Sequence, residues 1–572
     1  MRLKKVTAIL LTTAMAVTML SGCGNSADQT ANTSAGSTST NASDQSAANN
    51  TNDGVIKEFT AFFAVPGSEI NDDNTVQQKI TEITGAKAKE VWLTGQTAEE
   101  AVGTMIAGGE YPDFIDGSSG MAQLYDAGAL VALDDYLDNY PNIKNFYTEE
   151  QWESIRQDDG HIYWIQQFGN IYEKDMATLP MEAFWIQTRV LKWDNYPEIK
   201  TLDQYFDLLT RYNEANPTME DGTANIPYTI LCDDWRYFCL ENPGMFLAGY
   251  PNDGACIVDT DTLTVVDYNT NPESKQYFQK LNVEFKNGII DPESFTQSYD
   301  QYIAKLSTGR VLGMVDQYWN FGYTVIDSLK SQGLYEQGCS YVPLPITLEE
   351  GAQNQWYTTG GSINVASGLA ITTSCKDVEG ALQFLNDLLS DEVMTLREWG
   401  IEGVNYLVNE DGTFYRTDEM RANAAETAYK ASDLCSYSYF PKWSGMSHDG
   451  INAANPGDQP GEFFDGLPLD TQECLEAYGY HTYLDMLGIQ EIPGPWYPMW
   501  SYSNGFTTAT KGGTAWEKVK EIKHEYLPKV VMAGDFDSAW DEYMGVYANC
   551  NPQDFLDELQ TELDRRIQMA AE

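Results

Sequence analysis

Four short stretches of the chain place tryptophan or tyrosine directly beside carboxylate, amide or guanidinium side chains: residues 163–168, 233–237, 316–320 and 354–357. An aromatic ring offers a flat apolar face, and polar neighbours supply directional hydrogen bonds around it. This combination suits a ligand that has apolar C–H faces and a rim of hydroxyl groups. The candidate stacking residues are Trp164, Trp235, Trp319 and Trp356, and their candidate partners are Gln166, Asp234, Arg236, Asp316, Tyr318 and Asn320. Because a tryptophan is more often a core residue, the pattern by itself leaves both roles open.

Patterns that would indicate catalysis or a bound cofactor do not occur in the sequence. The four histidines are dispersed, and none lies in the H-E-x-x-H arrangement of a zinc enzyme. Neither a G-x-S-x-G nucleophile motif nor a phosphate-binding P-loop is present. With 85 acidic residues in the chain, two carboxylates close together in the sequence do not identify an acid–base pair. We therefore expect a binding protein without a cofactor, a metal site or catalytic residues.

The N-terminus has the features of an export signal. A basic start at residues 2–5 is followed by an apolar run over residues 6–20, which is too short for a comfortable transmembrane helix. The run ends in Leu20-Ser21-Gly22-Cys23, which resembles the bacterial lipobox. We predict a signal peptide over residues 1–22 and a lipid on Cys23, whose two acyl chains would suffice for stable anchoring. The alternative is an ordinary secretory signal that happens to end near a cysteine.

The segment after the lipobox is typical of a tether. Residues 24–54 contain no aromatic and no large aliphatic side chain, so they cannot bury enough apolar surface to offset their ordering entropy. We predict that residues 23–54 form a disordered tether with a reach of about 30 Å. The body of the protein is then expected outside the cytoplasm, anchored by lipid at the cell membrane.

Charge and cysteine content restrict the partners and the covalent chemistry. The net charge of −51 repels nucleic acid and anionic lipid, and argues against polyanionic ligands. Eight cysteines lie beyond the lipobox, without C-x-x-C or zinc spacing and partly among apolar residues, which suits buried free thiols. Cys232 and Cys239 could pair, although export permits disulfides without requiring them.

Strand and helix patterns alternate along residues 55–572. Apolar runs predict strands, and apolar residues at helical spacing predict amphipathic helices. The predicted strands are 59–65, 88–93, 183–190, 311–315 and 366–372, and the predicted helices are 74–84, 97–107, 202–213, 273–286, 302–307, 378–389, 515–532 and 552–569. This order indicates an α/β protein with a largely parallel N-terminal sheet and a helical C-terminal part.

Seven segments resemble, in chain order, the signature segments of one family. One is Gly288-Ile289-Ile290-Asp291-Pro292, similar to the family's Gly-Leu-Ile-Asp-Pro. The segments lie within residues 107–115, 124–136, 159–163, 184–191, 284–292, 309–319 and 399–406. The family is that of the extracellular solute-binding proteins, the capture subunits of bacterial ABC importers, in the group that mostly handles carbohydrates.

The resemblance implies a fold, a site and partners. It implies the two-lobed, periplasmic-binding-protein-like fold of type II, with lobes joined by crossing hinge strands. The expected lobes are residues 55–182 plus about 366–398, and residues 183–365 plus about 399–572. The ligand would be a carbohydrate, expected to be an oligosaccharide, and Trp319 holds a family position for ligand contact. The other implied partners are the permease subunits of the importer, and we expect a monomer.

One departure from the family concerns calcium. Long members of the family often carry a carboxylate-rich loop, but residues 216–227 keep few acidic ligands in that pattern. A hard cation such as Ca²⁺ needs six or more oxygen ligands, so the sequence does not support a bound calcium there.

Two other functions stay open at this point. A lipid-anchored glycoside hydrolase would need two carboxyl groups about 5–10 Å apart in a cleft. A binding protein of the same fold could instead take peptides or another small solute.

Overall fold

The computed structural model describes residues 56–251, 253–356, 358–359 and 364–571. The predicted signal peptide, Cys23 and the tether lie outside these residues. Within the described part of the chain, no helix is both long enough and apolar enough to cross a membrane.

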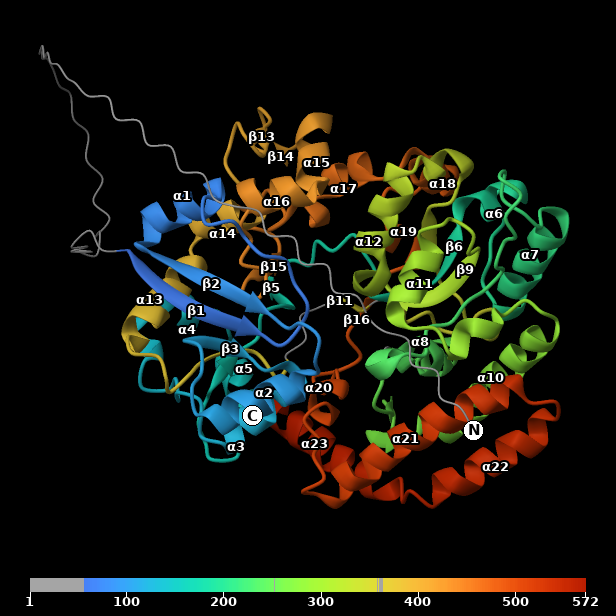
Figure 1. Ribbon diagram of the computed structural model, residues 1–572. Coiled ribbons are helices and arrows are strands. Elements are labelled where there is room, and N and C mark those ends of the chain that lie inside the picture. Colours follow the sequence, from blue (N-terminus) through green and yellow to red (C-terminus); the bar gives the residue numbers. More distant parts are fainter. Residues whose placement is uncertain (1–55, 252, 357, 360–363, 572) are drawn as a thin grey trace, which may run out of the picture. The chain divides into compact units, whose positions relative to one another are not determined.

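A five-stranded sheet brings together three distant parts of the chain (Figure 1). In spatial order its strands are β2 (Ala86–Trp92), β1 (Lys57–Phe63), β3 (Phe114–Asp116), β12 (Leu369–Ile371) and β4 (Trp164–Ile165). β1 pairs in parallel with β2 and β3, whereas β12 runs antiparallel to β3 and to β4. The strands β1, β3 and β4 therefore end at the same edge of this sheet, which we call the first lobe's sheet.

The helices predicted beside this sheet begin at side-chain caps. The Asn74 side chain accepts a hydrogen bond from a backbone N–H in the first turn of α1 (Thr75–Thr84). Thr97 forms a reciprocal capping box at the start of α2 (Ala98–Gly108). Gly85 follows α1 with a φ of 69°, a left-handed conformation that other residues rarely adopt. The predictions of these two helices and of the first two strands are confirmed.

A separate three-stranded sheet forms the base of the second lobe (Figure 1). Its order is β10 (Tyr341–Leu344), β6 (Glu182–Gln187) and β9 (Gly313–Gln317), and both pairs are antiparallel. The strand predicted over residues 183–190 ends earlier, because the chain turns into α6 (Thr188–Trp193) where Thr188 donates its backbone N–H to the carbonyl of Ser340. The chain passes from the first sheet to the second through residues 166–181.

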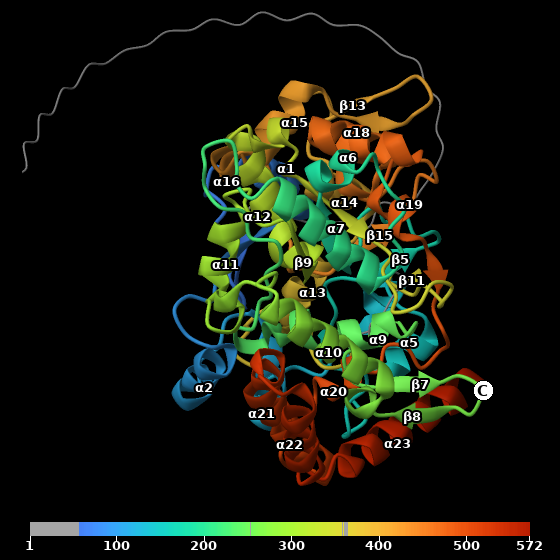
Figure 2. The same ribbon diagram turned by 90° about the vertical axis from the view of Figure 1, so that its right-hand side faces the viewer.

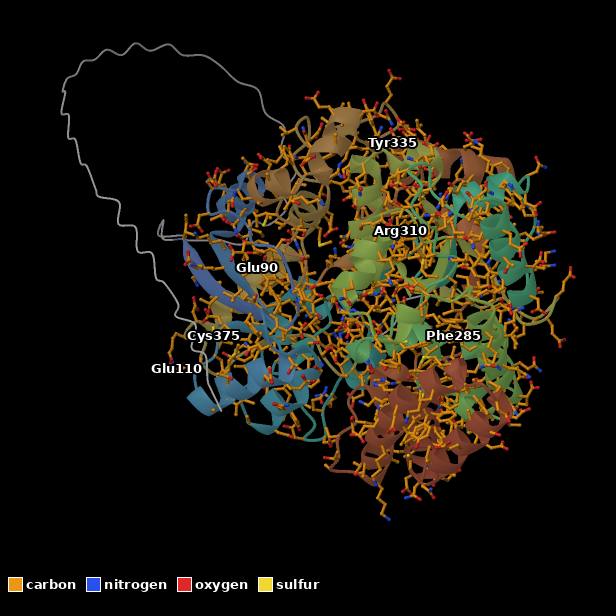
Figure 3. The ribbon with its side chains drawn as sticks, turned by 45° about the vertical axis from the view of Figure 1, so that its right-hand side comes forward. Glu90, Glu110, Phe285, Arg310, Tyr335 and Cys375 are labelled. Atoms are coloured by element: carbon orange, nitrogen blue, oxygen red, sulfur yellow. The ribbon has the colours of Figure 1, made fainter. Side chains whose placement is uncertain are left out.

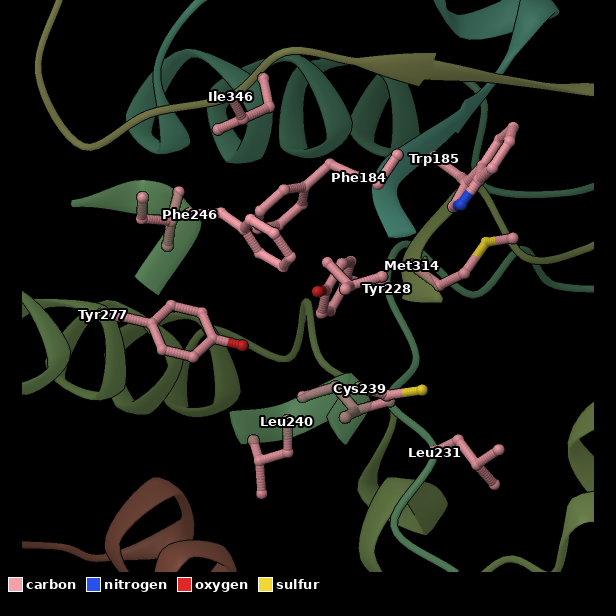
Figure 4. Packing of buried hydrophobic residues seen from close by; sticks show 14 of the residues in the cluster. Phe184, Trp185, Tyr228, Leu231, Cys239, Leu240, Phe246, Tyr277, Met314 and Ile346 are labelled. Atoms are coloured by element: carbon pink, nitrogen blue, oxygen red, sulfur yellow. The ribbon is translucent and has the colours of Figure 1, made fainter. Parts of the chain in front are cut away.

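Large side chains cover the second sheet (Figure 4). Trp185 on β6 and Met314 on β9 are fully buried and lie opposite each other in register. The ring of Phe184 packs 5.2 Å from Tyr205 and 5.5 Å from Trp356. This dense core holds the end of β9, which carries Asp316 and Gln317, in a defined position.

The C-terminal helices pack on the second lobe (Figure 2). They are α21 (Lys511–Met532), α22 (Phe536–Ala548) and α23 (Gln553–Ala571). Asn282, on α10 (Pro272–Lys286), donates to backbone carbonyls at the end of α21. The helical C-terminal part is thus confirmed, with α22 as an additional helix that the sequence pattern did not predict.

A later segment packs on the first lobe rather than on the second. Cys435, Tyr437 and Phe440 are buried in the same cluster as β1 and β3. The buried guanidinium of Arg397 donates to the backbone carbonyls of residues 436–441 and holds them there. These contacts favour extending the first lobe beyond residue 398 to about 445, and we propose this boundary in place of the expected one.

The same guanidinium influences a buried carboxyl on β2. Burial raises the pKa of Glu90 to about 8, and the charge of Arg397 offsets this only in part. Glu90 lies on the first lobe, whereas Arg310 and Phe285 belong to the second (Figure 3). The raised pKa of Glu90 thus follows from its packing within the first lobe.

All eight cysteines from Cys232 to Cys550 are buried, and none of these described residues forms a disulfide. Cys239 donates its thiol to a carboxylate oxygen of Asp316 at 3.4 Å. The possible pair of Cys232 and Cys239 is therefore not formed, because the second thiol is engaged elsewhere.

Candidate ligand-binding site

Two exposed aromatic rings and one half-buried ring lie together on the second lobe, and we call them the aromatic platform: Trp235, Trp319 and the half-buried Phe238. The rings of Trp235 and Trp319 lie 5.7 Å apart and 14° from parallel, and Phe238 lies 5.9 Å from each. The exposed fractions of Trp235 and Trp319 are 55% and 42%. Two large apolar rings held open to solvent favour a ligand-binding role over a core role.

Two elements that are far apart in the sequence carry the platform. Trp235 lies in the short helix η3 (Asp234–Tyr237), which leads into α8 (Phe238–Glu241). Trp319 lies in the first turn of α12 (Tyr318–Ser331), directly after β9. The buried strand therefore delivers Trp319 to the end of the second sheet, where η3 meets it.

Arg236 connects the platform to polar groups. Its guanidinium carbon lies 4.5 Å from the ring centre of Trp235 and 4.0 Å from that of Tyr299, within range of cation–π attraction to both. Its Nε donates to the side-chain oxygen of Asn320 at 3.1 Å. The two sequence clusters at 233–237 and 316–320 thus form one site.

Asp316 and Asn320 lie behind this site rather than at its surface. Asp316 is fully buried and accepts hydrogen bonds from the Asn320 amide at 2.9 and 3.1 Å and from the Tyr302 hydroxyl at 2.9 Å. Burial nevertheless raises the pKa of Asp316 to about 6. Their burial disfavours direct ligand contact, which stays a prediction; in this structure Asp316 positions Asn320, and Asn320 positions Arg236.

Asp234 is exposed at the start of η3 and has a φ of 51°, in the left-handed region. Asparagine and aspartate tolerate this conformation better than most residues. Its neighbour Asp233 accepts a hydrogen bond from the backbone N–H of Tyr299 at 2.8 Å. Asp234 thus lies next to the platform, and of the two neighbouring acids it is the one open to solvent.

Two predicted site residues of the second lobe belong to the core. Trp356 is 2% exposed, stacks on Phe246 at 4.0 Å and donates its indole N–H to the carbonyl of Ile346. Tyr318 is buried against Trp185 and Tyr483. Neighbouring rings pack against both side chains, so this structure does not favour ligand contact by either, and that contact stays a prediction.

The predicted residues of the first lobe are also covered. Trp164 on β4 is 3% exposed and meets the edge of Tyr125. Gln166 follows β4 and is buried, with its side-chain oxygen accepting the backbone N–H of Asn364 at 2.8 Å. Trp164 is thus a core residue, whereas the Gln166 amide nitrogen is buried without a hydrogen-bond partner among the described residues.

The exposed aromatic residue of this lobe is Phe168, two positions after Gln166. It is 46% exposed, and its ring lies 5.1 Å from that of Tyr439. Tyr439 in turn packs edge-on against Trp92 at the end of β2. Phe168 ends the 163–168 cluster but is not among the predicted site residues. No sequence signal identifies Tyr439, because its neighbours come from distant segments.

A buried carboxyl lies at the same edge of the first sheet. Asp116, the last residue of β3, accepts a hydrogen bond from the Gln167 amide at 2.7 Å. Burial raises its pKa to about 6 despite this bond. Its other hydrogen-bond donor among the described residues is the backbone N–H of Ser118, at 2.8 Å.

Two residues of α21 contact the helices η3 and α8, which carry part of the platform. The ring of His524 on α21 stacks on Tyr237 at 3.6 Å and 14°, next to Arg236 in the chain. Its neighbour Lys523 forms a buried ion pair of 2.6 Å with Glu241 at the end of α8. Burial lowers the pKa of His524, which favours the neutral ring in this stack. The sequence did not indicate these contacts, since they join segments almost 300 residues apart.

A hollow of about 480 Å³ lies elsewhere on the first lobe. It is lined by Tyr125, Asp126, Gly128, Leu130, Asp159 and Tyr163. Because Tyr163 precedes β4 and Gln166 follows it, the hollow lies at the opposite end of this strand from Gln166 and Phe168. Its lining residue Tyr125 meets the edge of Trp164, whereas Phe168 does not line this hollow.

A guanidinium from outside the loop contacts residues 216–227. Arg189 donates to the sulfur of Met219 at 3.0 Å and to the side-chain oxygen of Asn225 at 3.1 Å. Among the described residues, no group of three or more histidine, cysteine, aspartate or glutamate side chains is arranged to hold a metal ion. The loop is thus held by contacts within the protein.

The chain is similar to known proteins in sequence and in fold. The sequence model of a family described as bacterial extracellular solute-binding protein matches residues 78–401, which is more than half of the chain. Over 315 residues the chain is 26% identical to the fructooligosaccharide ABC transporter substrate-binding protein FusA of Streptococcus pneumoniae, covering 52% of this chain and 54% of that protein. Over 356 residues it is 20% identical to the polygalacturonan/rhamnogalacturonan-binding protein YtcQ of Bacillus subtilis, covering 60% and 66%.

Solved structures confirm the fold. The human-milk-oligosaccharide (HMO) binding solute-binding protein of Bifidobacterium longum infantis superimposes with a TM-score of 0.63 at 15% identity, over 89% of this chain and 98% of that one. At such low identity the similarity establishes the two-lobed type II fold and leaves the ligand undetermined. The matched segments of the two curated relatives span less than two thirds of their lengths. By its family match and its fold, this chain belongs to the bacterial extracellular solute-binding proteins.

Proposed function

We propose that this chain captures a carbohydrate, specifically an oligosaccharide, and delivers it to the permease subunits of an ABC importer. The observation that carries the proposal is the exposed pair of Trp235 and Trp319, with Arg236 beside it. Sugar rings have apolar C–H faces that pack on indole rings and hydroxyl groups that need directional partners. Two nearly parallel indoles offer room for more than one sugar ring.

The names of similar proteins support the same ligand class. FusA is described as binding fructooligosaccharides, and YtcQ as binding polygalacturonan or rhamnogalacturonan. These ligands differ from one another in sugar and charge, so they support a carbohydrate and do not favour one particular sugar.

The proposed mechanism is capture by closure, without catalysis. The platform supplies the second lobe's contact surface, and Phe168 with Tyr439 supplies the first lobe's. A ligand that touches both surfaces stabilises the closed conformation by its higher affinity for that state. No chemical step is needed, because the binding energy itself drives the change in population.

The proposed location is the outer face of the cell membrane. A lipid on Cys23 would anchor the protein there, and a tether over residues 23–54 would let it capture ligand and dock on its permease. The protein would act as a monomer, and its net charge of −51 disfavours nucleic acid as a partner.

The test is a calorimetric screen of the purified protein against neutral and acidic oligosaccharides, with short peptides as a second panel. The screen uses full-length protein in a detergent without a sugar headgroup, so that the detergent does not compete. We expect binding of at least one oligosaccharide, no binding of peptides, and no cleavage products on long incubation. Tight peptide binding without any response to sugars would overturn the ligand class, and turnover of an oligosaccharide would indicate a hydrolase.

A further inference from the structure

Arg236 has hydrogen-bonding capacity that the protein does not use. Its guanidinium carbon lies over the rings of Trp235 and Tyr299, and these contacts with the ring faces use no N–H group as a hydrogen-bond donor. Nε donates to Asn320. Neither terminal nitrogen has a hydrogen-bond or ion-pair partner among the residues that the structure describes. Four N–H bonds beside the exposed platform are thus available to a ligand.

This lack of a carboxylate partner is notable in a chain with 85 acidic residues. Asp233 and Asp234 lie three and two positions before the arginine, yet neither forms an ion pair with it. Asp233 accepts from Tyr299 at 2.8 Å, and Asp234 is directed to solvent at a left-handed residue. The local backbone therefore turns the nearest negative charges away from the guanidinium.

Other arginines of the chain differ in this respect. Arg211 also lies over an indole, that of Trp193 at 5.8 Å, but it pairs with Asp194 at 2.9 Å and with Asp207 at 2.7 Å. Arg397 has no ion-pair partner within the described part of the chain, but it donates to several backbone carbonyls. Arg236 lies over an indole, as Arg211 does, and lacks an ion-pair partner among the described residues, as Arg397 does. Of these three arginines, Arg236 is the one that lies beside the aromatic platform.

We propose that the ligand is an acidic oligosaccharide, and that Arg236 pairs with a carboxylate on one of its sugars. This inference rests on the proposed function and adds the charge of the ligand to it. The terminal nitrogens of a guanidinium match the two oxygens of a carboxylate in a bidentate pair. The rings of Trp235 and Tyr299 and the bond to Asn320 hold the guanidinium plane, so little side-chain freedom is lost on binding.

The net charge of the protein limits how acidic the ligand is. A chain with a net charge of −51 repels a polyanion at long range, while a paired charge at contact distance is screened less. A ligand with one carboxylate gains the contact with Arg236 and meets little long-range repulsion. The favoured class is an oligosaccharide in which one sugar is a uronic or similar acid and the others are neutral.

The experiment compares matched ligand pairs. Each pair is a glucuronic-acid-bearing xylooligosaccharide or a galacturonic-acid-bearing oligosaccharide and its carboxyl-reduced, neutral counterpart. Calorimetry on the full-length protein is expected to give at least tenfold tighter binding for the acidic member of one pair. This preference should decrease as the salt concentration rises, because the contact is ionic. Equal affinities within every pair that binds would overturn the proposed charge and leave carbohydrate capture intact.

Variants assign the preference to this residue. Arg236→Gln should remove the preference for the acidic member, and Arg236→Lys should retain part of it, because the charge persists without the bidentate geometry. Arg211→Gln is the matched control and should change neither affinity. Melting temperatures show whether each variant is folded. An acid preference that survives in folded Arg236→Gln would contradict the assignment, and the absence of any oligosaccharide binding in the wild type would refute the function on which it rests.

Discussion

The indole of Trp235 lies 5.7 Å from that of Trp319, and the two rings are within 14° of parallel. Trp235 lies in η3, before α8, and Trp319 lies in the first turn of α12, so the pair exists only because β9 ends where η3 is held. Arg236, fixed by Asn320, and Tyr237, stacked on His524, hold η3 from two sides. The open face of this pair is therefore a property of the second lobe's packing.

Replacement of a platform ring should reduce ligand affinity without unfolding the protein. We expect Trp319→Ala to weaken oligosaccharide binding at least tenfold, since stacking on a sugar face is lost, with little change in melting temperature because the ring is 42% exposed. Calorimetry and thermal unfolding measure the two effects. Trp193→Ala is the control, because Trp193 is 44% exposed on another element. Unchanged affinity in Trp319→Ala would remove this residue from the site.

Replacement of the buried Trp356 should reduce stability and leave ligand affinity nearly unchanged. We expect Trp356→Ala to lower the free energy of unfolding by about 3–5 kcal/mol, because it leaves a cavity beside Phe246 and a carbonyl of Ile346 without its partner. Urea unfolding followed by fluorescence measures this loss. The fraction of the protein that stays folded should bind ligand with nearly normal affinity. Loss of affinity with unchanged stability would return Trp356 to the ligand site.

The buried carboxyl behind Arg236 should make stability depend on pH. Burial raises the pKa of Asp316 from its ordinary 3.8 to about 6, so the folded protein retains this proton when the unfolded chain has released it. The stability that protonated Asp316 contributes is therefore lost as the pH rises from about 4 to about 6. The difference in unfolding free energy between the wild type and Asp316→Asn should fall over this window, by at most about 3 kcal/mol.

The measurement is urea unfolding of both proteins at several pH values across this window. Asp327→Asn is the control, since Asp327 is exposed on the same helix α12. A wild-type-minus-variant difference that is independent of pH would contradict the buried, protonated state of Asp316.

Replacement of the lipobox cysteine should abolish lipidation. We expect Cys23→Ala to be exported without lipid and to be released from the membrane, because the sulfur is the predicted acceptor of the diacylglyceryl group. Metabolic labelling with a palmitate analogue, followed by fractionation, measures this. Ser26→Ala, in the predicted tether, should be labelled like the wild type. A label that persists in Cys23→Ala would refute the anchor at this position.

Local patterns determined the elements and part of the site. The apolar spacing of residues 74–107 was sufficient for two helices, and caps at Asn74 and Thr97 agree with them. The seven ordered segments were sufficient for the family and its two lobes. The types and neighbours of Trp235, Arg236 and Trp319 were sufficient to predict them as ligand contacts, because an aromatic ring beside polar groups is visible in a short stretch of sequence.

The tertiary structure decided which of the candidate residues can reach a ligand. Trp356 has the same kind of neighbours in sequence as Trp319, but Phe246 and the carbonyl of Ile346 cover it. Tyr439 and His524 acquire their roles from segments far away in the chain, and so no local pattern could indicate them. Exposure is a property of the packed surface and depends on long-range contacts, whereas helix and strand patterns depend on near neighbours. The proposed lobe boundary could not be predicted from local patterns either. Arg397 holds residues 436–441 on the first lobe through their backbone carbonyls, and such contacts do not depend on the side-chain types of those residues.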